Sequence, residues 1–362
     1  MTTSAKIVVL NPGSATIKWQ CYPALDSSQP IASGQGDIAE LEAELTKITA
    51  EVAAYSYVVR FVHGGDLFCQ PVVISDKNFK FLQGLSDWAP LHNHNSLLCV
   101  QHLLQRCEDC KIVAVFDTHF FRDLPPAAKT YGLPDWLTQK YKLRRYGFHG
   151  FAHQAMCDTW TTHNGKNRSY ALVTMQLGSG CSMAAIKDGQ VIDTTMGFTP
   201  NEGLLMSTRS GDIDACLVTW LQKREGWTPE ETERVLNKDS GWFGVSAQSK
   251  DMAELLDSHS DKAQLAVDIF CHRVRKTLGA YYVLLGGLDG IVIGGGIGEH
   301  AVTLRRRLLE NLNHLGIDID DKLNHNPGRF GVISSPQSRV HCLVAAENEM
   351  LMMLHEAVPL LK

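Results

Sequence analysis

Two arginines stand in places where a positive charge needs an explanation. Arg60 lies inside an apolar run that reads as a strand, and Arg209 lies in the polar stretch of residues 206–214. The planar guanidinium offers a fork of donors that fits carboxylate and phosphate oxygens. The alternative for each is a structural salt bridge, for which Asp212 and Asp214 are sequence neighbours of Arg209. The two residues therefore indicate either an anionic substrate or internal ion pairs.

Histidines form a second group with chemical potential: His63, His92, His94, His119, His149 and His153. His149 and His153 are four residues apart, which places them on one face of a helix. A zinc site of the H-E-x-x-H type would need a glutamate that is absent here. His149, which follows Arg144-Arg145-Tyr146-Gly147, fits better as a donor to a developing negative charge. We expect His94 and His119 to be structural.

A glycine-rich turn supplies a third element of the chemistry. The buried run Gly290-Ile291-Val292-Ile293 leads into Gly294-Gly295-Gly296-Ile297-Gly298-Glu299, and a helix is expected from about Ala301. Glycine allows the backbone to approach a nucleotide closely, and a helix N-terminus favours an anion. The turn is not a Walker A motif, because no Gly-Lys-Ser/Thr follows. A tight packing turn is the alternative.

Acidic residues near the C-terminus complete the group. Ala346-Glu347-Asn348-Glu349-Met350 opens a helical pattern. Acids at a helix start are usually caps, but beside a polyphosphate one of them would hold Mg²⁺ through oxygen.

The elements that position these residues recur in the two halves of the chain. Ile7-Val8-Val9-Leu10-Asn11-Pro12-Gly13-Ser14 resembles in outline Leu172-Val173-Thr174-Met175-Gln176-Leu177-Gly178-Ser179. Each apolar run meets Gly-Ser and then resumes its alternation, which predicts a β-hairpin. Small residues and free N–H groups at each turn suit a phosphate. The repeat suggests a duplicated fold holding a polyphosphate between its halves, as in a phosphotransferase.

Periodicity predicts the other elements. We expect helices at residues 37–52, 96–106 and 261–285, the second with Leu97, Val100, Leu103 and Leu104 on its buried face. We expect strands at residues 57–62 and 111–116 and a capping box in Thr228-Pro229-Glu230-Glu231. We also expect a hairpin at residues 170–195 that turns back at Lys187-Asp188-Gly189. Asp117 follows the strand at 111–116, where open α/β sheets bind ligands.

Composition limits the class of protein. The chain has 362 residues, enough for two domains, with 44% hydrophobic and 20% charged residues and a net charge of −5. The basic cluster Arg305-Arg306-Arg307 reads as the solvated face of a helix, which argues against nucleic acid. Ten scattered cysteines, among them the lone pair Cys107 and Cys110, indicate free thiols in a cytoplasmic protein. No apolar run reaches the ~20 residues of a membrane span.

The set of motifs resembles the acetate kinase family, with its short-chain acyl kinase relatives, within the sugar kinase, heat-shock chaperone and actin superfamily. The resembling pieces keep their order along almost the whole chain: Asn11-Pro12-Gly13-Ser14, Val62-His63-Gly64-Gly65, Pro90-Leu91-His92-Asn93, Val115-Phe116-Asp117-Thr118, Arg145-Tyr146-Gly147-Phe148-His149-Gly150, Thr208-Arg209-Ser210-Gly211-Asp212, Gly295-Gly296-Ile297-Gly298-Glu299 and Asn348-Glu349.

The resemblance implies an α/β fold of two duplicated βββαβαβα domains with a cleft between them. The first domain would comprise residues 1–150 with the C-terminal helix 347–362, and the second residues 151–346. The implied reaction is reversible, Mg²⁺-dependent phosphoryl transfer between ATP and acetate, giving ADP and acetyl phosphate, in a cytoplasmic homodimer.

The resemblance also assigns roles to single residues. Arg60 and Arg209 would bind the carboxylate and the phosphoryl group in transit, His149 would stabilise the transition state, and Asp117 would orient these groups. His92 would shape the acetate side, and Asn11 and Glu349 would position Mg²⁺. The implied nucleotide-binding residues are Lys18, Ser179, Gly180, Asp251, Gly295, Gly296, Ile297 and Gly298.

The chain departs from the family pattern mainly on the nucleotide side. The family's His-Leu-Gly-Asn-Gly is Gln176-Leu177-Gly178-Ser179-Gly180 here, so Ser179 replaces an asparagine that contacts phosphate. The family's Asp-x-Arg ends in Ala253, and His300 stands where an asparagine is usual. The family's Phe-Asp-Thr-Ala-Phe-His becomes Phe116-Asp117-Thr118-His119-Phe120-Phe121.

Several interpretations therefore stay open. The acyl substrate is acetate, propionate or butyrate, and the phosphoryl partner is ATP, another nucleotide or pyrophosphate. A sugar or polyol kinase would use Asp117 as its base, although two arginines suit an anionic acceptor better. A nucleotide-binding protein without activity would have no need of both arginines and His149.

Overall fold

The computed structural model describes residues 6–13, 15–52, 54–85, 90–107, 109–165, 169–328, 331–346 and 348–362, with the side chains of residues 90–92 excepted. By their contacts these residues form two compact units. Unit 1 comprises Met1–Arg122, Phe148–Phe151 and Asn348–Lys362, and unit 2 comprises Asp123–Gly147 and Ala152–Glu347. The domain limits expected from the sequence stay a prediction.

The described part of unit 1 is built on a mixed sheet of six strands in the order β3-β2-β1-β4-β6-β5. β1 pairs antiparallel with β2 and parallel with β4, and β4 pairs parallel with β6. The predicted first hairpin is therefore confirmed. The strands are β1 (Ile7–Pro12), β2 (Thr16–Tyr22), β3 (Ala32–Asp37), β4 (Ser56–Phe61), β5 (Val72–Val73) and β6 (Lys111–Phe116).

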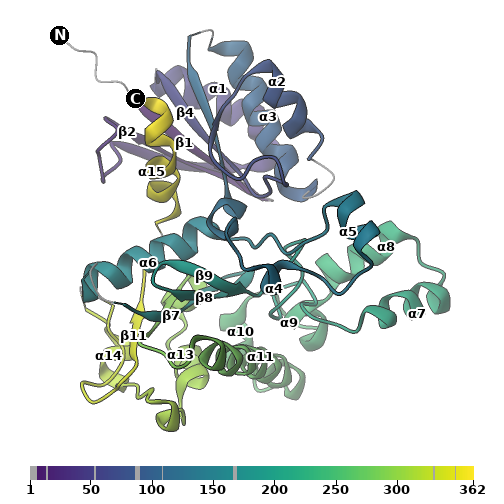
Figure 1. The fold of residues 1–362 in the computed structure, drawn as a ribbon, viewed down its shortest axis with the longest axis vertical. Helices are drawn as coiled ribbons and strands as arrows, with labels where there is room; N and C mark the ends of the chain where they lie inside the picture. Colours follow the sequence, from purple (N-terminus) through teal and green to yellow (C-terminus); the bar gives the residue numbers. More distant parts are fainter. Residues whose placement is uncertain are drawn as a thin grey trace. The chain divides into compact units, whose positions relative to one another are not determined.

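Both faces of this sheet are covered (Figure 1). One face packs on α1 (Leu41–Val52) and α3 (Pro90–Arg106), and the C-terminal helix α15 (Glu349–Leu361) contacts β1, β4 and β6. Side chains two residues apart along a strand lie on the same face of the sheet. The position two residues after each of the buried residues Val9, Val58 and Val115 therefore shares a face with it. Asn11, Arg60 and Asp117 therefore belong to the face that α15 covers.

The described part of unit 2 contains a sheet of five strands in the order β11-β10-β7-β8-β9. This order repeats the order β6-β4-β1-β2-β3 of unit 1. β7 pairs antiparallel with β8 and parallel with β10, as β1 does with β2 and β4. This correspondence confirms the predicted duplication of a mixed α/β sheet. The strands are β7 (Ala171–Leu177), β8 (Cys181–Lys187), β9 (Gln190–Thr194), β10 (Gly290–Gly294) and β11 (His341–Val344).

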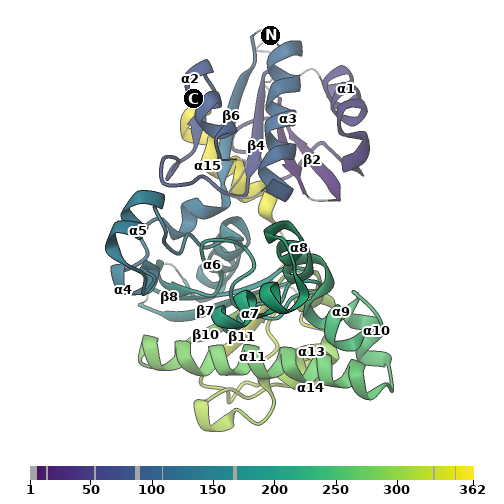
Figure 2. The same cartoon turned by 90° about the vertical axis from the view of Figure 1, so that its right-hand side faces the viewer.

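Two long helices cover the sheet of unit 2, α6 (Gly150–Asn164) on one face and α11 (Asp261–Leu285) on the other (Figures 1 and 2). A Cβ on Gly290 would lie 2.0 Å from the Trp160 ring of α6, so this strand approaches the helix too closely for any larger residue. Trp160 thus sets the distance between α6 and the sheet.

Shorter helices fill the remaining chain. They are α2 (Asp76–Gln83), α4 (Pro126–Lys129), α5 (Asp135–Tyr141), α7 (Ala215–Glu225), α8 (Pro229–Arg234), α9 (Gly241–Ser246), α10 (Met252–Asp257), α12 (Gly296–His300), α13 (Val302–Leu309) and α14 (Asp321–His325). The predicted capping box of α8 is present, because Thr228 and Glu231 each accept the other's backbone N–H. Among the described residues, no helix combines the length and apolarity needed to cross a membrane.

The structure adds detail to these expected elements and corrects one of them, α3. The polar segment before α1 contains the strand β3, which is exposed and so carries no apolar alternation. α3 begins at Pro90 rather than Ser96, and its Leu104 is 43% exposed. Residues 170–195 contain the expected turn after Lys187, between β8 and β9, and the antiparallel pairing of β7 with β8 makes this region three strands long. The helix expected from about Ala301 is confirmed as α13, which begins at Val302, and a further short helix, α12, precedes it.

Candidate active site

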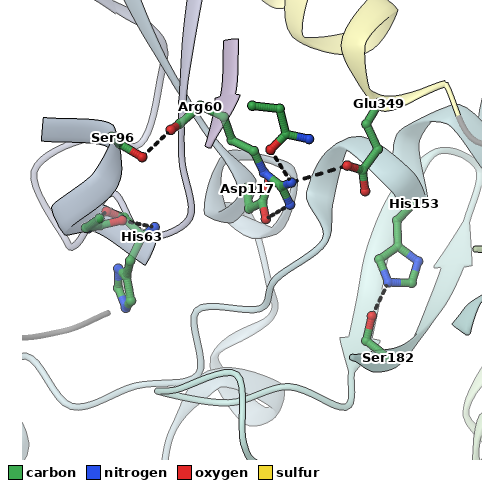
Figure 3. Close-up of polar contacts among 9 residues, drawn as sticks. Arg60, His63, Ser96, Asp117, His153, Ser182 and Glu349 are labelled. Carbon is green, nitrogen blue, oxygen red and sulfur yellow. Dashed lines mark hydrogen bonds and ion pairs between the residues drawn. The ribbon is translucent and has the colours of Figure 1, made fainter. Parts of the chain in front are cut away.

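Arg60 is the centre of a polar cluster at the ends of β1, β4 and β6 (Figure 3). Its Nε and Nη2 donate to the two carboxylate oxygens of Asp117 at 2.9 and 2.6 Å. Its Nη1 donates to Asn11 Oδ1 at 2.9 Å and to Glu349 Oε2 at 3.3 Å. The structure therefore brings four predicted site residues together within unit 1, and the salt bridge expected as an alternative for Arg60 is present as well.

Asp117 is nearly inaccessible, with 1% of its surface exposed. Burial raises the pKa of Asp117 to about 6, while the Arg60 guanidinium opposes that rise and the Glu349 carboxylate adds to it. The backbone N–H of His149 also bonds to this carboxyl group. Because the bidentate contact with Arg60 requires the ionised form, the charge state of Asp117 and the position of Arg60 depend on each other.

His149 holds a backbone conformation that is uncommon for residues other than glycine. Its φ is +60°, in the left-handed region. It precedes Gly150, where a Cβ would lie 2.0 Å from the Asp117 carbonyl oxygen, so only glycine fits there. The close packing of this turn on Asp117 keeps His149 in place, and strained residues of this kind cluster at functional sites.

A layer of buried polar residues lies beside Arg60, and no role was expected from the sequence for two of its members, Ser96 and Asn93. Ser96 Oγ donates to the Arg60 carbonyl oxygen at 2.6 Å. Asn93 binds the backbone of His63 in both directions, at 3.1 and 2.9 Å, and His63 Nδ1 accepts from the Gly65 N–H at 2.8 Å. Asn93 is part of the Pro-Leu-His-Asn motif, which was the signal available for it.

Two predicted residues of unit 1 are only partly placed. Lys18 lies on β2 directly opposite Asn11 in the antiparallel register, and its side chain is exposed. The backbone of His92 lies in the first turn of α3, but its side chain lies outside the described residues, as does Ser14 of the first turn.

Arg209 lies in unit 2, in a different setting from that of Arg60. Its Nη1 donates to the Pro200 carbonyl oxygen at 2.9 Å and lies 3.8 Å from Met206 Sδ. The acids considered as partners are used elsewhere, since Asp212 accepts from the Gly203 N–H and Asp214 caps α7. The salt-bridge alternative was therefore wrong, and Arg209 has no ion pair within the described ranges. Burial lowers the pKa of its guanidinium, which stays cationic.

The turn of the second hairpin is tied to the segment that carries Arg209. The Ser207 N–H donates to the Ser179 carbonyl oxygen at 3.0 Å, and the Gly178 N–H donates to the Gly180 carbonyl oxygen at 3.1 Å. Ser207 Oγ donates in turn to the Lys250 carbonyl oxygen at 2.9 Å, next to Asp251. In unit 2, the loop that carries Ser179 and Gly180 and the loop that carries Asp251 are thus linked by hydrogen bonds through Ser207. Asp251 also has a structural task, because its Oδ1 caps α10.

The glycine-rich turn serves both packing and access. Gly295 has a φ of +81°, and a Cβ there would lie 2.6 Å from the Leu177 carbonyl oxygen. A Cβ on Gly298 would lie 2.8 Å from Ile293. These two glycines fit the packing alternative, but at Gly296 a Cβ would meet nothing within 4 Å. Gly296, beside Ile297, is therefore the place where this turn leaves room for another molecule.

Arg305 is buried, contrary to the expectation of a solvated basic face. Its side chain donates to the carbonyl oxygens of Gly298 and Glu299 at 2.9 and 2.7 Å, and to Asn324 Oδ1 and O at 2.8 and 2.5 Å. It is 1% exposed. Arg305 therefore holds the C-terminal end of α12, the helix that begins at Gly296. Because Arg306 and Arg307 are also arginines, the sequence alone does not indicate which of the three side chains is buried.

His153 does not join His149 in a metal site. It is fully buried in unit 2, with Nδ1 2.7 Å from Thr174 Oγ1 and Nε2 2.8 Å from Ser182 Oγ (Figure 3). Burial lowers the pKa of His153 to about 3, so the ring is neutral. No group of three or more His, Cys, Asp or Glu residues is arranged to hold a metal in the described ranges. The cysteines there are free.

These features define a class of protein. Two α/β units share one strand order, and each carries an arginine among buried or partly buried polar groups. The family model of the acetokinase family matches residues 38–355. The chain belongs to this family of phosphotransferases.

Individual relatives agree with this membership. The acetate kinase of Dictyoglomus turgidum is 40% identical over an alignment of 395 residues, which covers 98% of this chain and 97% of that protein. The crystal structure of acetate kinase from Porphyromonas gingivalis matches with a TM-score of 0.88 at 30% identity, over 99% of this chain and 100% of that one. A propionate kinase from Francisella tularensis matches with a TM-score of 0.90 at 31% identity, over 97% and 98%.

Proposed function

We propose that this protein is an acetate kinase, transferring a phosphoryl group reversibly between ATP and acetate. The observation that carries the proposal is the state of Arg209, a partly buried guanidinium bound to a carbonyl oxygen rather than to a carboxylate. A buried cation without a negative partner is costly, and an anionic substrate would supply that partner. Acetate, acetyl phosphate and the phosphoryl group in transit are anions of the right chemistry.

The chemistry asks little of the protein beyond position and charge. A carboxylate oxygen of acetate attacks the γ-phosphorus of ATP, the new P–O bond forms, and the bond to the β-phosphate oxygen breaks to release ADP. Acetate is already ionised, so no general base is needed. Arg209 and His149 donate to oxygens whose charge changes in transit, which is where such donors lower the barrier most. Arg60, fixed by Asp117, binds a substrate oxygen without having to reorganise.

The residues of unit 1 fit the Mg²⁺ that this family's chemistry implies. Asn11 Oδ1 and Glu349 Oε2 approach the same Arg60 nitrogen, so two oxygen ligands already lie on one side of the cluster. Mg²⁺ in nucleotide sites is usually held by one or two such groups together with water and phosphate oxygens. When bound, the ion would neutralise phosphate charge, and Asn11 and Glu349 would position it.

A hydroxamate assay for acyl phosphate tests the proposal. Acetate, propionate and butyrate are each offered with ATP, GTP and pyrophosphate as phosphoryl partner. We expect acyl phosphate from acetate with ATP. Absence of product from every pairing would refute the kinase proposal. Product with pyrophosphate alone would refute ATP as the partner, which the changes at Ser179, Ala253 and His300 make worth testing.

A second acyl substrate has an observation in its favour. The Francisella tularensis protein that matches this chain with a TM-score of 0.90 is a propionate kinase. The ratio of kcat/KM for acetate to that for propionate decides between the two. The homodimer and the cytoplasmic location stay predictions, and light scattering of the purified protein measures the first.

A further inference from the structure

The C-terminal helix α15 carries Glu349 in its first turn, but that turn is not held by its own cap. Asn348 at the N-cap makes no side-chain bond to the helix. Such a bond normally fixes the start of a helix. The position of Glu349 therefore depends on contacts along the side of α15.

The apolar contacts of α15 do little to fix the register of the helix on the sheet. Its buried residues include three methionines, Met350, Met352 and Met353, beside Leu351, Leu354 and Ala357. Methionine side chains are flexible and adapt to several packings. Sliding or rotation of α15 on the sheet would thus cost little in apolar contact, and polar contacts must set its register.

A second polar contact lies two turns after Glu349 on the same side of α15. Glu356 Oε2 is 2.9 Å from Nδ1 of His119, and both side chains are largely buried. Seven residues span about two helical turns, so Glu349 and Glu356 point in the same direction. His119 follows Asp117 by two residues in the short 3₁₀ helix Asp117–Phe121. The segment that holds Arg60 through Asp117 therefore also holds α15 through His119.

The other ring nitrogen of His119 also has a polar neighbour. Arg122 Nη1 lies 2.7 Å from His119 Nε2. A guanidinium only donates, so Nε2 accepts in this contact, while Nδ1 lies at ion-pair distance from Glu356 Oε2 without the alignment of a hydrogen bond. Arg122, His119 and Glu356 thus form a chain of polar contacts that ends on α15.

We propose that the His119–Glu356 pair is a positioning contact that fixes the register of α15 and thereby places the Glu349 carboxylate beside Arg60 and Asn11. The assignment of Glu349 to the metal rests on the proposed function. His119 stands where the family pattern has alanine, so this contact is a property of this chain rather than of the family.

The test combines metal binding with hydrogen exchange in the full-length protein. Mn²⁺ is titrated in the presence of ADP and followed by electron paramagnetic resonance, and exchange is measured for the amides of residues 349–354. We expect His119→Ala and Glu356→Gln each to weaken Mn²⁺ binding about tenfold and to speed exchange in that turn, because supporting contacts of metal ligands have effects of this size. The double variant should bind Mn²⁺ no more weakly, and exchange these amides no faster, than either single variant, because both substitutions remove the same contact.

Two matched variants separate positioning from general stability. His119→Asn keeps an N–H donor near the place of Nδ1 and should bind Mn²⁺ within about twofold of the parent. His355→Ala removes the exposed histidine next to Glu356 and should change neither readout. If His119→Ala lowers the unfolding midpoint but leaves Mn²⁺ affinity and exchange unchanged, the pair only stabilises the fold and the proposal is wrong. Neither readout requires phosphoryl transfer, so failure of the proposed function is recognised separately.

Discussion

Arg60 and Arg209 are the same residue type in two opposite situations. In unit 1, Arg60 is bound by Asp117 in bidentate fashion and approached by Glu349, so its charge is compensated and its position fixed. In unit 2, Arg209 is bound to a carbonyl oxygen and a thioether. The difference teaches that an arginine can be prepared for an anion in two ways, by fixing its geometry or by leaving its charge uncompensated.

The buried histidine of unit 2 extends the contrast. His153 is neutral and binds two hydroxyl groups, whereas the cluster around Asp117 in unit 1 is charged. The cluster around Asp117 in unit 1 is thus arranged with ion pairs, and the cluster around His153 in unit 2 with neutral hydrogen bonds.

The largest effect is expected from removing the uncompensated charge. Arg209→Ala should lower kcat by about 10³-fold and leave the fold intact, because the lost contact is strongest in the transition state. Steady-state kinetics and circular dichroism measure the two properties. Arg224→Ala, at an exposed position on α7 of the same unit, is the control. A kcat within tenfold of the parent would remove Arg209 from the mechanism.

Removing the compensated charge should instead destabilise the protein. Arg60→Met leaves the buried carboxylates of Asp117 and Glu349 without their cationic partner, which should cost about 3 kcal/mol of unfolding free energy. Asp117→Asn in that background should restore part of the loss. Arg209→Met, which breaks no ion pair in the described structure, should cost less than about 1 kcal/mol. Urea unfolding compares the three, and equal losses for Arg60→Met and Arg209→Met would contradict the contrast.

Unit 2 contains the buried cation Arg305, whose described hydrogen-bond acceptors are all neutral. A variant of Arg305 tests whether hydrogen bonds to neutral groups are sufficient to stabilise a buried cation. Arg305→Met leaves four oxygen acceptors at α12 and Asn324 without a donor, and should cost about 2 kcal/mol. The KM for the nucleotide should rise while the KM for acetate stays constant, since α12 begins at Gly296. Arg306→Met, at a side chain that is 51% exposed, should cost less than about 0.5 kcal/mol. Equal effects at the two positions would show that the bonds of Arg305 are unimportant.

The smallest effects concern pH and should have opposite signs in the two units. The folded pKa of Asp117 is raised from 3.8 to about 6, so its contribution to stability is full below pH 3.8 and is lost as pH rises through about 6. The folded pKa of His153 is lowered from 6.5 to about 3, so its contribution is full above pH 6.5 and is lost as pH falls. Unfolding midpoints between about pH 4 and 7 should therefore change slope in opposite directions in Asp117→Asn and His153→Asn. Slopes of the same sign would refute one of the two shifts.

The sequence predicted the parts of the site that follow from strand periodicity. Arg60 inside an apolar strand and Asp117 at the end of another were recognisable, because parallel strands end at one edge of a sheet. The duplication was visible in the two apolar runs that meet a Gly-Ser turn. The roles of Asn11 and Glu349 were expected only through the resemblance to the family, and their hydrogen bonds with Arg60 were not expected.

Other features depend on tertiary contacts that leave no local pattern. β3 has an exposed backbone with small and polar residues, so neither face shows apolar alternation. Arg305 and Arg306 are adjacent and identical, and only the placement of Asn324 against α12 decides that one is buried. Arg209 was considered for pairing with Asp212, but helix capping and loop contacts use the acids nearby.

The placement of α15 has a consequence for the order in which the protein matures during synthesis. This helix covers one face of the sheet of unit 1, yet the ribosome makes it only after the whole of unit 2. Until then, the strand face that includes Val9, Val58 and Val113 has no cover from α15, and exposed apolar surface of this kind invites aggregation or chaperone binding. Unit 1 is thus begun first and finished last, and its charged site assembles only as the nascent chain brings Glu349 to Arg60.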